Sequence, residues 1–141
     1  MIHYIDTSVL AAYYCPEVLS SQIQRMLSKI EAPAISPLVE VELYCAVARK
    51  TRAGEFGAAE AHRIMSQFRL HAAEPRFHMV PFPVGCFGIA REWIASMNAP
   101  LRVMDGLHLA MAHINGMCMV TADAQLAASA KYFGVKYRLI S

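Results

Sequence analysis

Short apolar runs alternate along this chain with segments whose apolar residues recur every three to four positions. The β-prone runs predict strands over residues 2–5, 32–35, 77–82, 117–120 and 136–140. Helical periodicity predicts helices over residues 16–31, 37–52, 58–73, 86–97, 101–114 and 124–133. The polar cluster Asp6-Thr7-Ser8 predicts one more helix directly after the first strand. Strands therefore alternate with helices along most of the chain.

Local residue chemistry indicates several of these boundaries. Ser36 followed by Pro37 provides a cap and a first-turn proline for the helix that runs to about Arg52. The segment from Gly54 to Gly57 interrupts the helical pattern before it resumes. The two helical segments on either side of this break predict a helical hairpin.

The alternation of strands and helices is typical of α/β domains. Runs as apolar as residues 117–120 suit strands that are covered on both faces. We expect a three-layer α/β/α fold in which helices flank a central parallel sheet and the helical hairpin is an insertion. At 141 residues the chain has the length of a single domain, residues 1–141, with one core.

Composition adds an expectation about assembly. Hydrophobic residues make up 56% of the chain and charged residues 17%, and the mean hydropathy is +0.32. These values are high for a soluble monomer, so we expect a partner to cover part of the apolar surface. The net charge of +2 is too small to indicate nucleic-acid binding by itself.

The cysteines and the amino terminus argue against other classes of protein. Cys15, Cys45, Cys86 and Cys118 are widely spaced and form no CxxC motif, so we expect four reduced thiols, mostly buried, and no zinc site. The segment MIHYIDTSVL lacks the features of a signal peptide, and no run of eighteen apolar residues occurs. We therefore expect a cytoplasmic protein without a membrane segment.

Two acidic residues follow predicted strands. Asp6 follows the first strand and Asp123 follows the fourth. The carboxyl ends of parallel strands meet at one edge of a sheet, where ligands bind near the switch in strand order. Each residue could instead cap the next helix, although Ser8 offers another cap beside Asp6. We expect both carboxylates at one site.

Two further acidic residues lie within predicted helices. Glu42 has apolar neighbours and is a poor candidate for a solvated side chain, whereas the helix dipole favours Glu40 in the first turns, facing water. Asp105 lies early in a predicted helix that is apolar on nearly every face, and a contact with the helix amino terminus is the competing interpretation. A buried carboxylate needs a cation, a proton or several donors.

The residues around the acids refine this hypothesis. Thr121 lies two positions before Asp123, and its hydroxyl could orient an acid or a water. His108 and His113 lack the i, i+4 spacing of a zinc motif, so hydrogen-bonded core histidines are the better interpretation.

Three aspartates and one glutamate without a thiol or imidazole cluster describe an all-oxygen site suited to Mg²⁺ or Mn²⁺. Clustered carboxylates repel one another, so metal binding should lower their pKa values and acid should weaken activity. An ion of this kind neutralises phosphate charge and activates a water, which favours phosphodiester hydrolysis. No Ser-His-Asp arrangement, GxGxxG motif or P-loop favours another chemistry.

Four segments together closely resemble PIN domains, in particular the VapC-type toxins of bacterial toxin–antitoxin pairs: YIDTSVL, SPLVEVEL, LRVMDGLHLAMA and VTADAQLAASAKYFGV. The resemblance spans nearly the whole chain. It implies an Mg²⁺- or Mn²⁺-dependent endoribonuclease, usually dimeric, that is inhibited by a cognate antitoxin reaching into the acidic site. The matching positions give the acids of the family as Asp6, Glu42, Asp105 and Asp123, with Ser8 and Thr121 as the accompanying hydroxyl residues.

RNA would approach such a site through basic side chains. The candidates for phosphate contacts are Arg49, Lys50, Arg52 and Arg102, which could equally be solvated helix ends. Tyr13, Tyr14 and Phe87 are candidates for stacking on bases or on a partner helix, although core packing is the commoner role of aromatic residues.

Other functions stay open at this point. The fold could serve as a non-enzymatic binding module for RNA or a protein, with the acids binding metal only structurally. A structure-specific DNA nuclease would use the same metal chemistry. A phosphoryl-accepting receiver domain is disfavoured because it needs an aspartate after the third strand, where the sequence reads MVPFPVG.

Overall fold

The central element is a five-stranded parallel sheet with the strand order β3-β2-β1-β4-β5. The computed structural model describes residues 1–31 and 33–141. The strands are β1 (His3–Ile5), β2 (Ala34–Ile35), β3 (His78–Met79), β4 (Cys118–Thr121) and β5 (Tyr137–Leu139). The predicted parallel sheet is confirmed.

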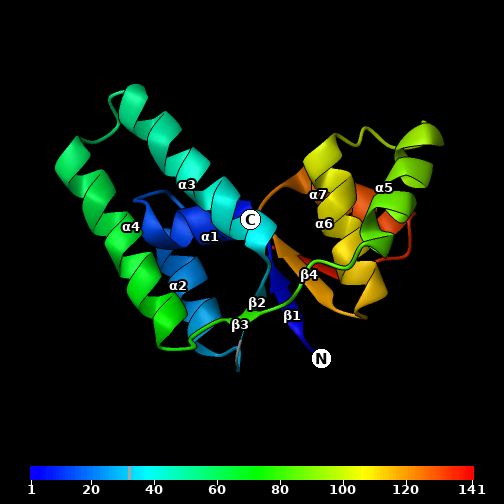
Figure 1. The fold of residues 1–141 in the computed structure, drawn as a ribbon, viewed down its shortest axis with the longest axis horizontal. Helices are drawn as coiled ribbons and strands as arrows, with labels where there is room; N and C mark the ends of the chain where they lie inside the picture. The colour runs from blue at the N-terminus through cyan, green and yellow to red at the C-terminus, as the bar shows by residue number, and fades with distance from the viewer. Residues whose placement is uncertain (32) are drawn as a thin grey trace.

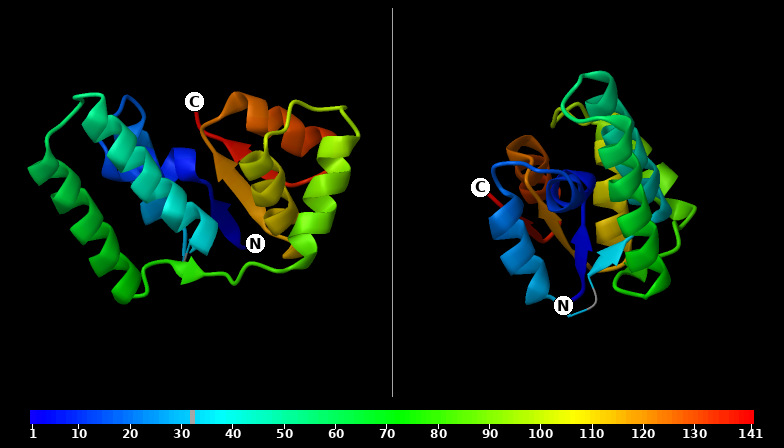
Figure 2. Two further views of the ribbon diagram at one scale, coloured as in Figure 1. Left: turned by 45° about the horizontal axis from the view of Figure 1, so that its top comes forward. Right: turned by 90° about the vertical axis from the view of Figure 1, so that its left-hand side faces the viewer.

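Helices cover both faces of this sheet, so the predicted three-layer α/β/α fold is confirmed. They are α1 (Thr7–Tyr14), α2 (Ser20–Ser28), α3 (Pro37–Arg52), α4 (Ala58–Ala73), α5 (Gly85–Ala95), α6 (Val103–Ile114) and α7 (Ala124–Tyr132). Figure 2 shows α2 and α7 on one side of the sheet and α3, α4 and α6 on the other. Figure 1 shows α3 and α4 side by side as the expected hairpin.

The strand order changes direction between β1 and β4. The chain passes from β1 to β2 and β3 on one side, and then returns to place β4 on the other side of β1. The register pairs Ile5 with Val120, and the backbone N–H of Asp6 donates to the Val120 carbonyl at 3.1 Å. The switch in strand order therefore lies next to Asp6, where parallel sheets bind ligands.

The core consists of apolar side chains from both faces of the sheet and from the helices packed on them. Burying one such side chain contributes about 1.5–3 kcal/mol. The fully buried residues include Tyr4, Ile5, Leu10, Ile35, Leu43, Ile64, Leu109, Met111 and Met119. Among the residues described, no helix is long and apolar enough to cross a membrane.

The prediction of one helix over residues 16–31 is wrong at both ends, because α2 spans only Ser20–Ser28. The Ser20 hydroxyl donates to the carbonyls of Ala12 and Cys15 and accepts from the Glu17 N–H. These bonds hold residues 15–19 as a turn against the end of α1, so the apolar Val18 is fully exposed.

The third strand is also shorter than predicted. It pairs only through His78 and Met79, rather than over residues 77–82. Proline cannot donate to a strand ladder, and Pro81 and Pro83 follow closely. The expected second strand began at residue 32, which lies outside the described residues, and its observed part is Ala34–Ile35.

The four cysteines are free, as expected. Cys15 and Cys86 are buried, whereas Cys45 is exposed on α3 and Cys118 is partly exposed. The expectation that the thiols are mostly buried therefore holds for only two of the four.

Candidate active site

Asp6 is the most deeply buried of the four acids, with 3% of its surface exposed. It caps α1 by accepting from the Val9 N–H at 3.1 Å through Oδ1, which also accepts from the Ser8 hydroxyl at 2.6 Å. Its Oδ2 accepts from the Thr121 hydroxyl at 2.5 Å. Burial raises the pKa of Asp6, and the hydrogen bonds from Ser8, Thr121 and Val9 oppose that shift only in part.

Ser8 and Thr121 also join the chain segments that leave β1 and β4. The Ser8 hydroxyl accepts from the Ala122 N–H at 3.0 Å, and the Thr121 hydroxyl accepts from the Asp123 N–H at 3.0 Å. The two hydroxyl oxygens lie 3.4 Å apart. These contacts hold Asp6 and the start of α7 in a fixed relation at the switch in strand order.

Glu42 lies on α3 and is partly exposed, not fully solvated. Its Oε1 accepts from the Thr7 hydroxyl at 2.9 Å and contacts His108 Nε2 on α6. Burial alone would raise the pKa of Glu42, but the contacts with His108 and Thr7 outweigh burial and lower it.

Asp105 and Asp123 both contact backbone N–H groups at helix amino termini, as the competing interpretation predicted. Asp105 Oδ2 accepts from the Arg102 N–H at 3.1 Å and lies 3.6 Å from Arg102 Nε. Asp123 Oδ1 accepts from the N–H groups of Gln125 at 2.9 Å and Leu126 at 3.3 Å. Both side chains are partly exposed.

A single cavity of about 510 Å³ brings together all four acids, which come from four different parts of the chain. Thr7, Ser8 and His108 also line it. Its basic residues are Arg49, Lys50 and Arg102, whereas Arg52 is not among the described lining residues. Lys50 pairs with Glu17 at 3.0 Å and Glu55 at 3.6 Å.

The chemistry of this lining fits a divalent cation bound by oxygen, because the buried Asp6 carboxylate and its three acidic neighbours share the cavity. The described residues nevertheless contain no group of three or more His, Cys, Asp or Glu side chains already close enough to hold a metal ion.

The histidine prediction holds for only one of the two residues. His108 is buried and hydrogen-bonded through both ring nitrogens, but it also contacts Glu42 at the cavity, which was not anticipated. The available signal was its position three residues after Asp105, which places both on one helix face. His113 is exposed beside Trp93, so its interpretation as a core histidine is wrong.

Of the three aromatic candidates for stacking, two pack in or against the core and one is exposed. Tyr14 is buried and its hydroxyl bonds to His71 at 2.7 Å, and Tyr13 packs against the core. Phe87 is 58% exposed and remains available for a partner.

The sequence and the fold were compared with known proteins. A family model described as PIN domain matches residues 3–132. No curated protein matches the sequence significantly.

Solved structures with the same fold include a toxin and a toxin–antitoxin complex. VapC20 of Mycobacterium tuberculosis, a toxin that cleaves the sarcin–ricin loop, has a TM-score of 0.70 at 18% identity, covering 90% of this chain and 94% of that chain. FitAcB from Neisseria gonorrhoeae has a TM-score of 0.73 at 17% identity, covering 96% of each chain. A toxin–antitoxin complex from Klebsiella pneumoniae gives 0.60 at 14% identity, covering 86% of each chain.

Proposed function

Because this chain belongs to the PIN domain family, we propose that it is a divalent-metal-dependent endoribonuclease and the toxin of a toxin–antitoxin pair. The observation that carries this proposal is the single cavity lined by Asp6, Glu42, Asp105 and Asp123 at the carboxyl edge of the sheet. Four carboxylates from separate elements converge there next to basic residues, an arrangement suited to a phosphodiester substrate.

Asp6, Glu42, Asp105 and Asp123 would hold Mg²⁺ or Mn²⁺. When bound, such an ion neutralises charge on the scissile phosphate and activates a water for hydrolysis. The cation also offsets the cost of keeping Asp6 ionised in a buried position. Ser8 and Thr121 position Asp6 through their hydroxyl groups.

The basic lining of the cavity supplies contacts for the phosphate groups of the RNA. Lys50 is already paired with Glu17 and Glu55. Arg49 is therefore the better candidate for binding phosphate, followed by Arg102, whose side chain is 83% exposed but lies 3.6 Å from Asp105.

We also propose that the ribonuclease activity takes place in the cytoplasm.

The antitoxin partner is supported by the fold neighbours, one of which is a toxin–antitoxin complex. An antitoxin that enters the cavity would compete with the RNA for the same residues. Expression of this chain alone should then arrest bacterial growth, and co-expression of its antitoxin should relieve the arrest.

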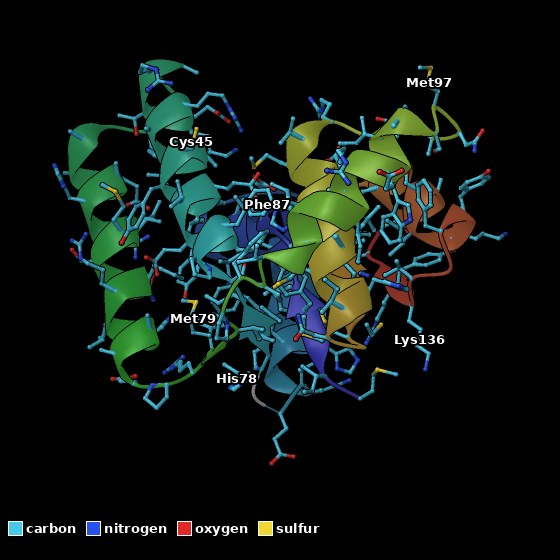
Figure 3. The ribbon with its side chains drawn as sticks, turned by 45° about the vertical axis from the view of Figure 1, so that its right-hand side comes forward. Cys45, His78, Met79, Phe87, Met97 and Lys136 are labelled. Atoms are coloured by element: carbon cyan, nitrogen blue, oxygen red, sulfur yellow. The ribbon has the colours of Figure 1, made fainter. Side chains whose placement is uncertain are left out.

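A homodimer is supported by apolar side chains that project from neighbouring helices. Val84 is 84% exposed and Phe87 58% exposed at the start of α5, and Val41 on α3 and Val103 on α6 are also exposed. Figure 3 shows Phe87 on the part of α5 that lies toward α3. Exposed apolar residues on three helices leave apolar surface that a second copy of the chain would cover.

The experiment that tests the nuclease proposal compares the wild-type protein with Asp6→Asn on a pool of structured RNAs and on single-stranded DNA. Each substrate is incubated with Mg²⁺, with Mn²⁺ and with EDTA. We expect metal-dependent cuts in RNA that disappear in Asp6→Asn. Glu40→Gln is the matched control, because Glu40 lies on the same helix as Glu42 but is not among the described residues that line the cavity.

Three results would overturn the proposal in different ways. Cleavage that persists in EDTA or in the Asp6→Asn variant would rule out the proposed metal site. Cleavage of DNA without cleavage of RNA would favour the DNA nuclease. A folded wild-type protein that binds RNA but cuts nothing with either metal would favour the binding module.

A further inference from the structure

A chain of buried hydrogen bonds crosses the core and ends at Glu42. The Ser36 hydroxyl lies 2.8 Å from the Tyr4 hydroxyl, which lies 2.8 Å from His108 Nδ1. His108 Nε2 contacts Glu42 Oε1. Ser36 and Tyr4 are fully buried and His108 is 4% exposed. We refer to Ser36, Tyr4, His108 and Glu42 as the Glu42 hydrogen-bond chain.

The direction of each hydrogen bond follows from the chemistry of its partners. A carboxylate only accepts, so His108 must carry a proton on Nε2. In a neutral imidazole Nδ1 is then an acceptor, and the Tyr4 hydroxyl donates to it. The Ser36 hydroxyl accepts from the Val39 N–H and donates to Tyr4. For a neutral His108, every hydroxyl and imidazole proton along the chain therefore points toward Glu42.

Tyr4 is suited to fix this arrangement. Its hydroxyl is fully buried between Ser36 and His108, at 2.8 Å from the hydroxyl of the first and 2.8 Å from Nδ1 of the second. A permanent donor at Nδ1 favours the tautomer with the proton on Nε2. Within the described part of the chain, every buried side-chain nitrogen and oxygen has a partner.

Both donors to Glu42 bond to the same carboxylate oxygen. Thr7 on α1 and His108 on α6 each contact Oε1. Among the described residues the carboxylate is thus held by one oxygen, and Oε2 is the oxygen left for a ligand in the cavity.

We propose that His108 is a positioning residue that fixes the Glu42 carboxylate for metal binding, and that Tyr4 holds His108 in the Nε2–H tautomer required for this. The metal-binding part of this inference rests on the proposed function, whereas the tautomer does not. The competing explanation is that the chain only satisfies polar groups in the core.

The tautomer is tested by NMR on the purified protein with ¹⁵N-labelled histidine. We expect the His108 signals, identified by their loss in His108→Gln, to show a protonated Nε2 and an unprotonated Nδ1. In Tyr4→Phe this preference should weaken, because Nδ1 loses its donor. A wild-type protein with an unprotonated Nε2 would overturn the proposal whether or not the protein cleaves RNA.

The positioning role is tested by Mn²⁺ affinity, measured by calorimetry, together with the melting temperature of each variant. Loss of a partner that orients a metal ligand weakens metal binding by about 10- to 100-fold, and we expect this for His108→Leu. His108→Gln retains an amide N–H and should recover most of the affinity. The control is His113→Gln, because His113 lies on the same helix and is exposed.

The outcomes separate this inference from the proposed function. If the folded His108→Leu variant bound Mn²⁺ as tightly as the wild type, the positioning role would be wrong. If His108→Leu failed to fold, a Tyr4→Phe variant with wild-type affinity and an unchanged tautomer would overturn it instead. A wild-type protein that bound no Mn²⁺ would refute the metal site and this positioning role together, and the NMR result would still decide the tautomer.

Discussion

The Thr121 hydroxyl donates a hydrogen bond of 2.5 Å to Asp6 Oδ2, joining residues that are 115 positions apart in the sequence. It connects the ends of β1 and β4 at the switch in strand order. Because the Thr121 hydroxyl also accepts from the Asp123 N–H, one side chain orders both strand-end acids.

Thr121→Val should therefore reduce the affinity for metal while leaving the shape of the side chain nearly unchanged. Valine keeps the volume of threonine but removes the hydroxyl, so Asp6 loses a donor that opposes its raised pKa. Loss of such a supporting contact typically costs about 10- to 100-fold in metal affinity or activity. The measurement is Mn²⁺ affinity and RNA cleavage rate, with Thr121→Ser as the control that restores the hydroxyl. Equal losses in both variants would contradict the role of the hydroxyl.

Asp6→Asn should stabilise the metal-free protein at neutral pH. Burial raises the pKa of Asp6, so the native state binds this proton more tightly than the unfolded state. The stability from Asp6 is therefore present in acid and lost as the pH rises through the raised native pKa. Asparagine does not ionise, so the gain at neutral pH should be on the order of 1 kcal/mol, or about 4 °C in melting temperature.

Melting curves in EDTA from acid to neutral pH check this prediction. The difference between Asp6→Asn and wild type should vanish in acid, where Asp6 is protonated in the native protein. Mg²⁺ should raise the melting temperature of the wild type but not that of the variant, because only a ligand-binding native state is stabilised. A variant that is less stable than the wild type at every pH would contradict the prediction.

The sequence could predict the elements whose ends depend on local chemistry. Ser36 and Pro37 mark the start of α3 by their own capping and backbone properties, and the structure begins the helix at Pro37. The position of Asp6 next to β4 could also be predicted, because parallel strand ends meet at one edge. These inferences need only neighbouring residues or the fold class.

The remaining features depend on contacts between distant segments, which no periodicity reveals. The start of α2 depends on bonds from Ser20 to the end of α1. The contact between Tyr4 and His108 joins residues 104 positions apart. The apolar helix around His108 indicates from the sequence that His108 is buried. Its contact with Glu42 at the cavity becomes visible only in the structure.

The Tyr14 hydroxyl supports the packing of α1 on α4 through His71. Its oxygen lies 2.7 Å from His71 Nδ1, and both residues are buried. Burial lowers the pKa of His71, which favours the neutral ring, and Nδ1 shares a hydrogen bond with the tyrosine hydroxyl. Tyr14→Phe leaves this buried nitrogen without its partner and should cost about 1–3 kcal/mol in the free energy of unfolding.

Urea unfolding measures this cost, with Tyr13→Phe as the neighbouring control. The pKa of His71 is lower in the native state than in the unfolded state. Its contribution to stability is thus present above the unfolded pKa and is lost as the pH falls through the lowered native pKa. We expect Tyr14→Phe to have a lower free energy of unfolding than the wild type at neutral pH. A loss no larger than that of Tyr13→Phe would show that the hydrogen bond contributes little to stability.

Arg102→Gln should weaken RNA binding more than it slows cleavage. The side chain is 83% exposed at the cavity and its Nε lies 3.6 Å from Asp105 Oδ2, whereas the hydrogen bond from its backbone N–H to Asp105 survives the substitution. We expect KM to rise about 3- to 10-fold and the salt dependence of binding to become shallower, because one phosphate contact is lost. Arg52→Gln is the control, since Arg52 is not among the described residues that line the cavity. Equal effects of the two variants would place the RNA elsewhere.

Phe87→Asp should convert the proposed homodimer into a monomer. Phe87 is 58% exposed and packs edge-on against Phe82, and a carboxylate in its place would lose its hydration on association. Light scattering after gel filtration should give twice the chain mass for the wild type and the chain mass for the variant. Met97→Asp is a matched control, because Met97 is 88% exposed and Figure 3 shows it at the far end of α5. A wild-type monomer, or dissociation by both substitutions alike, would rule out an interface centred on Phe87.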